Sequence, residues 1–204
     1  MTAVTFATVQ QCGSEPVARR RGRPPAVTHA SIADAVLAVG FSGLTYAAVG
    51  ERLDVSLATL FRHVRGRDEL SRLGLDLALR RHPWPDVVGP WRSMLESWAV
   101  SAWTLWEQHP GAVVELSRGV LPPALGQLSG QVRDALVDAG FTPGNAVRAV
   151  DLVFGLVTDV RPTPGAADTD DGAGPRERFL GTLRVVLAAI EVELAPRCAL
   201  ADAS

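Results

Sequence analysis

Side chains that can recognise a DNA base or a phosphate group gather in one short stretch of the chain, from Thr45 to Val64. The second half of this stretch carries Thr59, Arg62 and His63 within five residues. An arginine guanidinium can donate two hydrogen bonds to a guanine, and a threonine offers a hydroxyl or a methyl group to a base edge. This stretch is therefore predicted to recognise DNA bases by hydrogen bonds and apolar contacts.

Two short helices joined by a tight corner must position these side chains. Thr45 is a suitable N-cap for the first helix and Ser56 for the second. Asp54 lies at the corner, where left-handed backbone is expected and aspartate is tolerated better than most residues. Gly50 is small where the two helices must approach closely. The predicted inner core consists of Val49, Leu53, Val55 and Leu60. This spacing predicts a helix-turn-helix, and the alternative is a helical hairpin with a solvated polar face.

The same stretch resembles the TetR family of bacterial transcriptional regulators. The match has no gaps and comprises Gly43–Leu53, Val55–Ser56, Thr59–Val64 and Gly66–Leu70, within a region of about residues 28–75. Three positions depart from the family pattern. Phe61 stands where a tyrosine is usual, Asp54 replaces the usual glycine, and Ala47 falls where an arginine is frequent.

The resemblance implies a set of DNA contacts. At the start of the first helix they are Thr45, Tyr46 and Ala47; on the recognition helix they are Leu57, Ala58, Thr59, Phe61, Arg62 and His63; and Arg67 would contact a phosphate. Thr45 and Tyr46 would lie at a helix N-terminus, which favours phosphate, whereas Ala47 could only pack. His63 has a second possible role, in packing against the next helix.

The charge distribution agrees with DNA binding by the N-terminal part of the chain. Residues 1–82 carry 11 arginines and 7 acidic residues, and residues 83–204 carry 9 arginines and 15 acidic residues. Residues 1–24 are predicted to be a disordered basic arm, in which Arg21-Gly22-Arg23-Pro24 resembles the core of an AT-hook. Arg21 and Arg23 would then enter an A·T-rich minor groove. Non-specific phosphate binding by the arm is an equal alternative.

Apolar periodicity and helix-breaking residues predict an all-α chain of about nine helices. An N-terminal three-helix helix-turn-helix domain, residues 25–72, is followed by a helical regulatory domain, residues 73–204. A long helix over residues 86–107 carries four of the five tryptophans and is expected to be buried on most sides.

By resemblance, the second domain binds a small molecule and dimerises. The candidate ligand-binding residues are Trp98, Trp103, Trp106 and Phe154, with Met94 and Arg118 as weaker ones. For any single tryptophan, a place in the ordinary core is the favoured interpretation. Apolar helices over about residues 144–160 and 176–194 could form a four-helix interface in a homodimer, which would read a palindromic double-stranded operator. A small apolar or aromatic effector would release a repressor from this operator. The alternative is an effector-free or architectural DNA-binding protein with a filled core.

The sequence argues against catalysis, a cofactor and a bound metal. His29, His63, His82 and His109 are scattered, and no H-E-x-x-H, C-x-x-C, G-x-S-x-G or phosphate-loop pattern occurs. The acidic residues at 168, 170 and 171 lack the spacing of an EF-hand loop. We therefore expect the protein not to be an enzyme.

The sequence also predicts a cytoplasmic protein. The longest uncharged run, Ala35–Gly50, is too short and too rich in glycine and hydroxyl side chains to span a membrane. The N-terminal arginines follow the apolar residues instead of preceding them, so no signal peptide is expected. Only Cys12 and Cys198 are present, which favours a reducing compartment.

Overall fold

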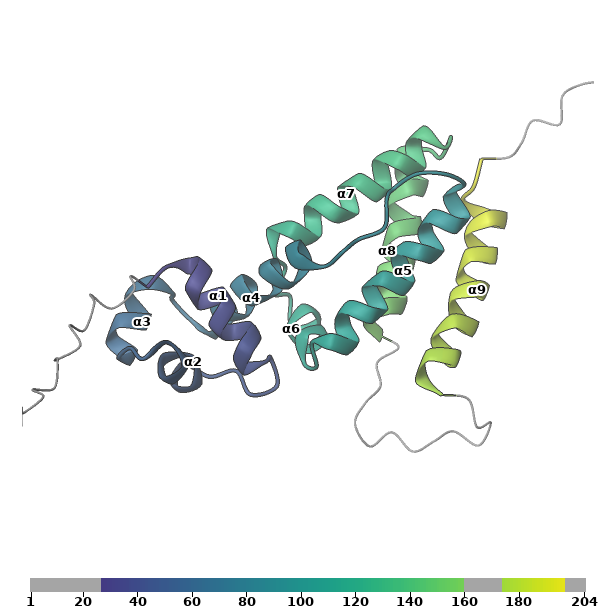
Figure 1. Ribbon diagram of the computed structural model, residues 1–204. Coiled ribbons are helices and arrows are strands. Elements are labelled where there is room, and N and C mark those ends of the chain that lie inside the picture. The colour runs from purple at the N-terminus through teal and green to yellow at the C-terminus, as the bar shows by residue number, and fades with distance from the viewer. Residues whose placement is uncertain (1–26, 160–173, 197–204) are drawn as a thin grey trace, which may run out of the picture.

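The computed structural model describes residues 27–159 and 174–196, and within these ranges every regular element is an α-helix. The helices are α1 (His29–Val39), α2 (Tyr46–Leu53), α3 (Leu57–His63), α4 (Arg67–Arg81), α5 (Trp91–Gln108), α6 (Ala112–Ser117), α7 (Pro123–Asp138), α8 (Pro143–Asp159) and α9 (Pro175–Glu193). Helices α1 to α3 form a small group at one end of the molecule, and α9 lies at the other end (Figure 1). The predicted all-α fold with about nine helices is confirmed for the described part of the chain.

Local signals set most of the helix boundaries. The hydroxyl of Thr28 accepts a hydrogen bond from the Ser31 N–H, and the Ser31 hydroxyl bonds the Thr28 N–H in return, so a capping box begins α1. Gly40 ends α1 with a φ of 80°, which a glycine adopts at little cost. The predicted start of the long helix at residue 86 is wrong, because α5 begins only at Trp91. Residues 82–90 contain bends in place of helix, and Gly89 has a φ of 90°, which an α-helix does not allow.

The small helical group closes its core against α4. Helix α1 packs on α2 and on α4, and the buried side chains between them include Val36, Phe41 and Leu75. Gly74 allows the close approach of α1 to α4, since a Cβ there would overlap Val36 Cγ1 and lie 3.3 Å from Phe41 Cε1. The predicted domain boundary at residue 72 falls inside α4, which also contacts α6 and α7.

This close approach makes Gly74 sensitive to substitution. We expect Gly74→Ala to lower the free energy of unfolding by about 1–3 kcal/mol, the usual cost of overpacking a core. Gly126→Ala in α7 is the matched control, because nothing lies within 4 Å of the added Cβ. The control should gain up to about 1 kcal/mol from helix propensity. Urea unfolding followed by circular dichroism measures both, and equal effects of the two substitutions would contradict the tight α1–α4 contact.

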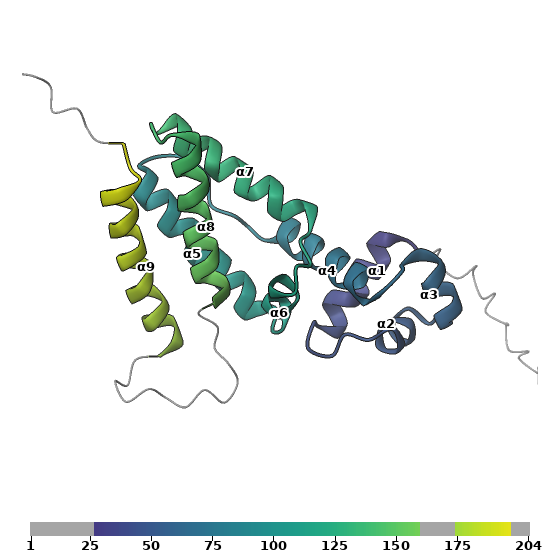
Figure 2. The same ribbon diagram turned by 180° about the vertical axis from the view of Figure 1, so that it is seen from behind.

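Helix α5 is the centre of the larger group. It contacts α7, α8 and α9, which surround it when the molecule is seen from either side (Figures 1 and 2). Eight of its side chains are buried, including Leu95, Ala99 and Leu105. Burial on several sides follows from the broad apolar surface predicted for this helix. No helix in residues 27–159 or 174–196 is long and apolar enough to cross a membrane.

Candidate nucleic-acid interface

The corner between α2 and α3 has the predicted geometry. The Thr45 hydroxyl accepts a hydrogen bond of 3.1 Å from the Ala48 N–H and caps α2, while the Ser56 hydroxyl accepts one of 3.2 Å from the Thr59 N–H and caps α3. Asp54 adopts left-handed backbone, with φ 54° and ψ 47°. A Cβ on Gly50 would lie 3.2 Å from the Val55 carbonyl oxygen, so a larger residue would push the two helices apart.

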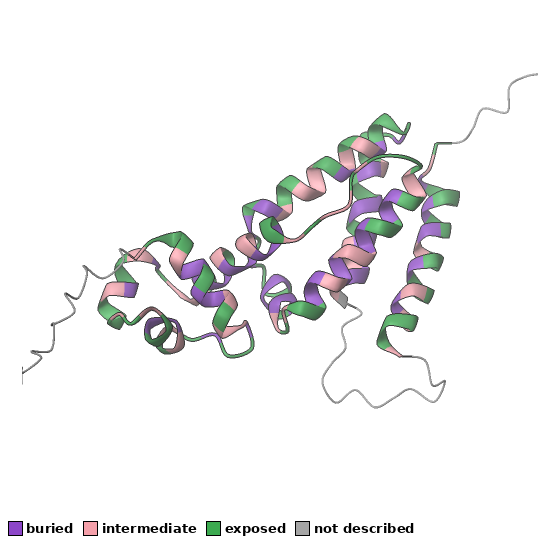
Figure 3. Ribbon diagram, viewed as in Figure 1, coloured by how far each residue is buried: buried purple, intermediate pink, exposed green. Residues whose placement is uncertain are grey.

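Helix α3 buries one residue and exposes the others to different degrees. Leu60 is fully buried, and Thr59 and His63 are half-buried. Most of the helix is solvent-facing, at the end of the molecule far from α9 (Figure 3). Its exposed side chains are Leu57, Ala58, Phe61 and Arg62, all of which were predicted as DNA contacts. Ala47, also predicted, is exposed on α2.

The polar side chains of α3 interact with one another. Arg62 Nη2 donates a hydrogen bond of 3.3 Å to Thr59 Oγ1, which lies 3.0 Å from Ser56 Oγ. A guanidinium carries five N–H donors. One bond to Thr59 therefore orients Arg62 and leaves it able to donate two hydrogen bonds to a guanine.

The structure gives Tyr46 a role in holding α2 against the turn that follows α3. Its hydroxyl donates to the Val64 carbonyl oxygen over 3.1 Å and accepts from the Gly66 N–H over 2.5 Å. Its ring stacks on Phe61 with the centroids 4.3 Å apart. Because the single hydroxyl hydrogen is already donated, Tyr46 cannot also donate to a phosphate in this conformation. A phosphate contact through the backbone at the start of α2 stays a prediction.

The two roles considered for His63 stay predictions. Its backbone carbonyl accepts a 3.1 Å hydrogen bond from His29 Nε2, which ties the end of α3 to the start of α1.

The Thr45 hydroxyl caps α2 and remains exposed, so it can still contact a phosphate. Arg21 and Arg23 lie outside the described residues.

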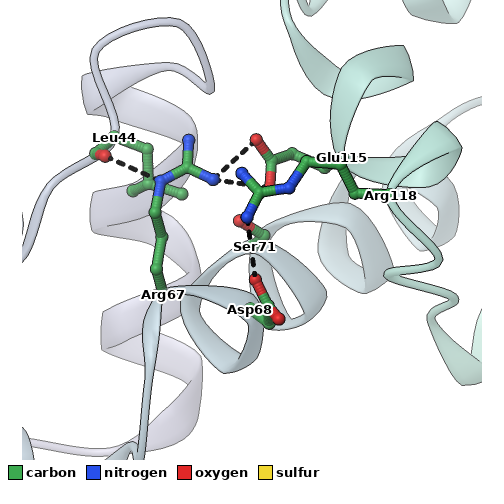
Figure 4. Close-up of polar contacts among 6 residues, drawn as sticks. All are labelled: Leu44, Arg67, Asp68, Ser71, Glu115 and Arg118. Atoms are coloured by element: carbon green, nitrogen blue, oxygen red, sulfur yellow. Dashed lines mark hydrogen bonds and ion pairs between the residues drawn. The ribbon is translucent and has the colours of Figure 1, made fainter.

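Arg67 has a protein partner where a phosphate was predicted. Its Nη1 lies 2.7 Å from both carboxylate oxygens of Glu115 in α6, and its Nε donates to the Leu44 carbonyl oxygen over 3.3 Å. Ser71 donates a third hydrogen bond to Glu115, over 3.0 Å. These side chains converge between α4 and α6 (Figure 4). An ion pair thus joins the two helices, and the contact of Arg67 with a phosphate stays a prediction.

Glu115 and Ser71 were not predicted as functional residues. Both are buried, and Glu115 is only 2% exposed. The sequence offers one local sign, a single acidic residue inside the apolar run Ala112–Leu116. Charged residues are rarely buried without a partner, but nothing in the sequence identified Arg67 as that partner.

A second set of contacts joins the helix-turn-helix group to the end of α5. Ser42 donates a 3.1 Å hydrogen bond to the Pro110 carbonyl oxygen, and the ring of Phe41 meets His109 edge-on at 6.2 Å. Burial lowers the pKa of His109, and the charge of His82 lowers it further. Burial also lowers the pKa of His82, partly opposed by its hydrogen bond with Ser101. Since histidine ordinarily titrates near pH 6.5, both imidazoles are neutral at pH 7.

The six candidate ligand residues do not share one environment. Met94 and Trp106 are buried, and Phe154 is half-buried. Trp98 stacks on Trp84 with the ring centroids 5.7 Å apart, and Trp103 stacks on Phe179 with the centroids 4.5 Å apart. Arg118 is exposed, and its guanidinium lies 3.8 Å from the Asp68 carboxylate. The indole N–H groups of Trp103 and Trp106 are buried and have no acceptor among the described residues. Arg118 lies at the contact of α4 with α6, so it belongs with the ion pairs there (Figure 4).

Helices α8 and α9 together form a hollow of about 720 Å³ that none of these six residues lines. Its walls include Leu152 and Gly155 of α8 and Val186 and Ala189 of α9, with Arg148 and Glu193 among its charged residues. This hollow coincides with the pair of apolar helices predicted to dimerise.

Comparison with known proteins places these features in context. No protein-family model matches the chain. A curated relative, the HTH-type transcriptional repressor DrrR1 of Streptomyces coeruleorubidus, is 29% identical over 144 residues, which are 67% of this chain and 53% of the relative. The chain thus aligns with about half the length of that repressor.

Solved structures show the same fold. The Streptomyces coelicolor TetR family protein ActR, in complex with actinorhodin, superposes with a TM-score of 0.70 at 18% identity, over 83% of this chain and 98% of ActR. BioQ, solved with its double-stranded DNA operator, superposes with a TM-score of 0.64 at 17% identity, over 82% of this chain and 99% of BioQ. The resemblance found in the sequence is confirmed at the level of the fold.

Proposed function

The chain has the fold of the TetR family of regulators, and from this premise we propose that it is a DNA-binding transcriptional regulator. The observation that carries the proposal is the exposed α3, which follows a left-handed corner at Asp54 and presents Arg62 at the surface. BioQ with its operator and the repressor DrrR1 support the proposal by similarity. We infer that the protein represses the genes that it regulates.

We propose that the protein acts as a homodimer through α8 and α9. Both helices carry exposed large apolar side chains, of which Leu152, Val185 and Val192 are 49%, 69% and 72% exposed. A two-fold axis through this face would make a four-helix interface. Two copies of α3 would then meet successive major grooves, which predicts a palindromic operator.

We propose that a small effector that carries hydrogen-bond acceptors binds among the helices of the larger group. Trp103 and Trp106 each bury an indole N–H that lacks an acceptor in the described chain, and such groups are costly unless something satisfies them. The complex of ActR with actinorhodin supports a ligand in this fold. The stacking of Trp98 on Trp84 and of Trp103 on Phe179 favours the alternative, a filled core without an effector.

Regulation would pass through the contacts between the two helical groups. Glu115 of α6 holds Arg67 at the start of α4, and Pro110 holds Ser42 in the turn before α2. A ligand that moved α6 would shift these contacts and change the separation of the two recognition helices. By linkage, operator DNA must then weaken ligand binding by the same factor.

Fluorescence anisotropy with duplex DNA from beside the protein's own gene tests the proposal, with a scrambled duplex and a salt series as references. We expect a preference of about a thousandfold or more for one duplex, the scale of specific binding. Equal affinity for both duplexes at every salt concentration would contradict sequence-specific regulation.

Arg62→Ala should weaken binding to the preferred duplex by about 5- to 150-fold, because a good bidentate contact to a guanine has that value. Binding to the scrambled duplex should change much less. Arg176→Ala is the matched control, since it removes an exposed arginine of α9, whose ion pair with Glu107 spans 3.9 Å. An unchanged preference in Arg62→Ala would show that α3 does not read the operator through this residue.

A further inference from the structure

We propose that α3 recognises its operator in large part through the C5-methyl groups of thymines, with Leu57, Ala58 and Phe61 as the contacting side chains. This inference rests on the proposed function, because it concerns how the same surface reads DNA. It adds a base preference that the fold does not specify.

The first observation is the exposure of apolar side chains on α3. Leu57 is 45% exposed and Phe61 is 53% exposed. They lie four residues apart and so share one face of the helix, with the exposed Ala58 next to Leu57. Single exposed apolar residues need no explanation, whereas a contiguous set on a surface suited to binding points to an apolar partner.

The second observation is that the hydroxyl groups near this surface are already engaged. Thr59 Oγ1 accepts from Arg62 and lies 3.0 Å from Ser56 Oγ, whose other contact is with the Thr59 N–H. The Tyr46 hydroxyl is bonded to the Val64 carbonyl and the Gly66 N–H. Among these groups Arg62 keeps the most donors, so it is the side chain best able to add a polar base contact.

The third observation is the position of the apolar side chains. Phe61 is held by its stacking on Tyr46, with the ring centroids 4.3 Å apart. Side chains fixed before binding lose little conformational freedom when they meet a base. Alanine and phenylalanine are among the residues that contact the thymine methyl in the major groove.

A cation borders the apolar set, although residues 27–72 as a whole contain five arginines and five acidic residues. Arg62 follows Ala58 by four residues and so borders the apolar set with a cation. A major groove rich in thymine complements this arrangement, with methyl groups opposite the apolar side chains and phosphates nearby.

The experiment selects duplexes from a random library with the full chain and then removes methyl groups one at a time. Deoxyuridine replaces each thymine of the selected sequence, which deletes only the C5-methyl. We expect at least one thymine in each half-site whose replacement weakens binding about three- to fivefold, the value of one buried methyl-sized group. Uridine outside the half-sites should have no effect.

Leu57→Ala should bring the thymine-to-uridine affinity ratio close to one at the position that Leu57 contacts. Phe61→Tyr keeps the aromatic ring and should keep the ratio. Val88→Ala is the control, because Val88 is an apolar residue, 73% exposed, in the segment between α4 and α5. Circular dichroism verifies that each variant is folded.

Three results would overturn the proposal. If duplexes are enriched but uridine has no effect at any position, thymine methyls are not read while DNA binding stands. If Leu57→Ala changes the oligomeric state and not the uridine sensitivity, a second copy of the chain covers this face. If no duplex is enriched at low salt, the proposed function fails together with this inference.

Discussion

Replacing Arg67 with methionine is expected to lower the free energy of unfolding by about 1–3 kcal/mol, because the buried Glu115 carboxylate loses its ion-pair partner, although Arg67 itself is 35% exposed. The carboxylate of Glu115, 2% exposed, would keep only the hydrogen bond from Ser71. Methionine replaces the aliphatic part of arginine, so the change concerns charge more than packing. Urea unfolding of the full chain measures the effect.

The double variant Arg67→Met/Glu115→Leu tests the physical reason. Replacing a whole buried ion pair with apolar residues is often neutral or stabilising, because neither charge then has to leave water. We therefore expect the double variant to recover most of the lost stability. A double variant as unstable as Arg67→Met would show that the charge of Glu115 is not the cause.

Arg118→Met is the matched control in the same region. Arg118 and Asp68 are each more than half exposed and 3.8 Å apart, and exposed pairs contribute about 0–1 kcal/mol. The loss should thus be several-fold smaller than for Arg67→Met. Similar losses in the two variants would contradict a special role for the buried pair.

The same variants decide whether Arg67 also meets DNA. If Arg67 contacted a phosphate, the plot of log affinity against log salt concentration would be less steep for the double variant, by about 0.9 in slope. We expect an unchanged slope, because the carboxylate of Glu115 already compensates the charge of Arg67.

The sequence predicted the parts of the fold that depend on neighbouring residues. The caps at Thr45 and Ser56 and the left-handed corner at Asp54 each involve atoms only a few residues apart. The start of α5 was misplaced by five residues because Pro90 was not read as the last extended residue before the helix. Spacing within α3 places Leu60 in the core, but it does not indicate that Leu57 and Phe61, which are also apolar, stay exposed.

Long-range contacts could not be predicted in the same way. Arg67 and Glu115 are 48 residues apart, and nothing near Arg67 indicates that its guanidinium turns towards α6 instead of towards DNA. Tyr46 shows the same limit, since its partners Val64 and Gly66 lie about 20 residues away. A side chain at a predicted interface can therefore be recruited for internal support, which only the packing of the helices determines.

The tryptophans show a further limit. Hydrophobicity correctly predicted that Trp98, Trp103 and Trp106 are buried. It could not predict that two of them stack on aromatic partners or that two indole N–H groups lack an acceptor in the described chain. Whether an effector satisfies those groups depends on the space between helices, which composition does not encode.

The second large effect is expected at the face formed by α8 and α9. Leu152→Asp would place a carboxylate in the proposed apolar dimer interface, where burying its charge costs free energy. Leu152 is 49% exposed, so the single chain should still fold. Sedimentation should then give a species near the monomer mass of 21.6 kDa, whereas we expect a dimer for the unmodified protein.

Operator binding should fall with the loss of the dimer. Two linked recognition helices gain about a hundredfold or more over one, through the effective concentration of the second site. We therefore expect Leu152→Asp to weaken operator binding by at least that factor while α3 itself is unchanged. Val88→Asp, which adds the same charge at an exposed apolar residue between α4 and α5, should stay dimeric and bind normally. A dimeric Leu152→Asp with full affinity would place the interface elsewhere on the molecule, whereas a monomer with full affinity would mean that one α3 is enough for recognition.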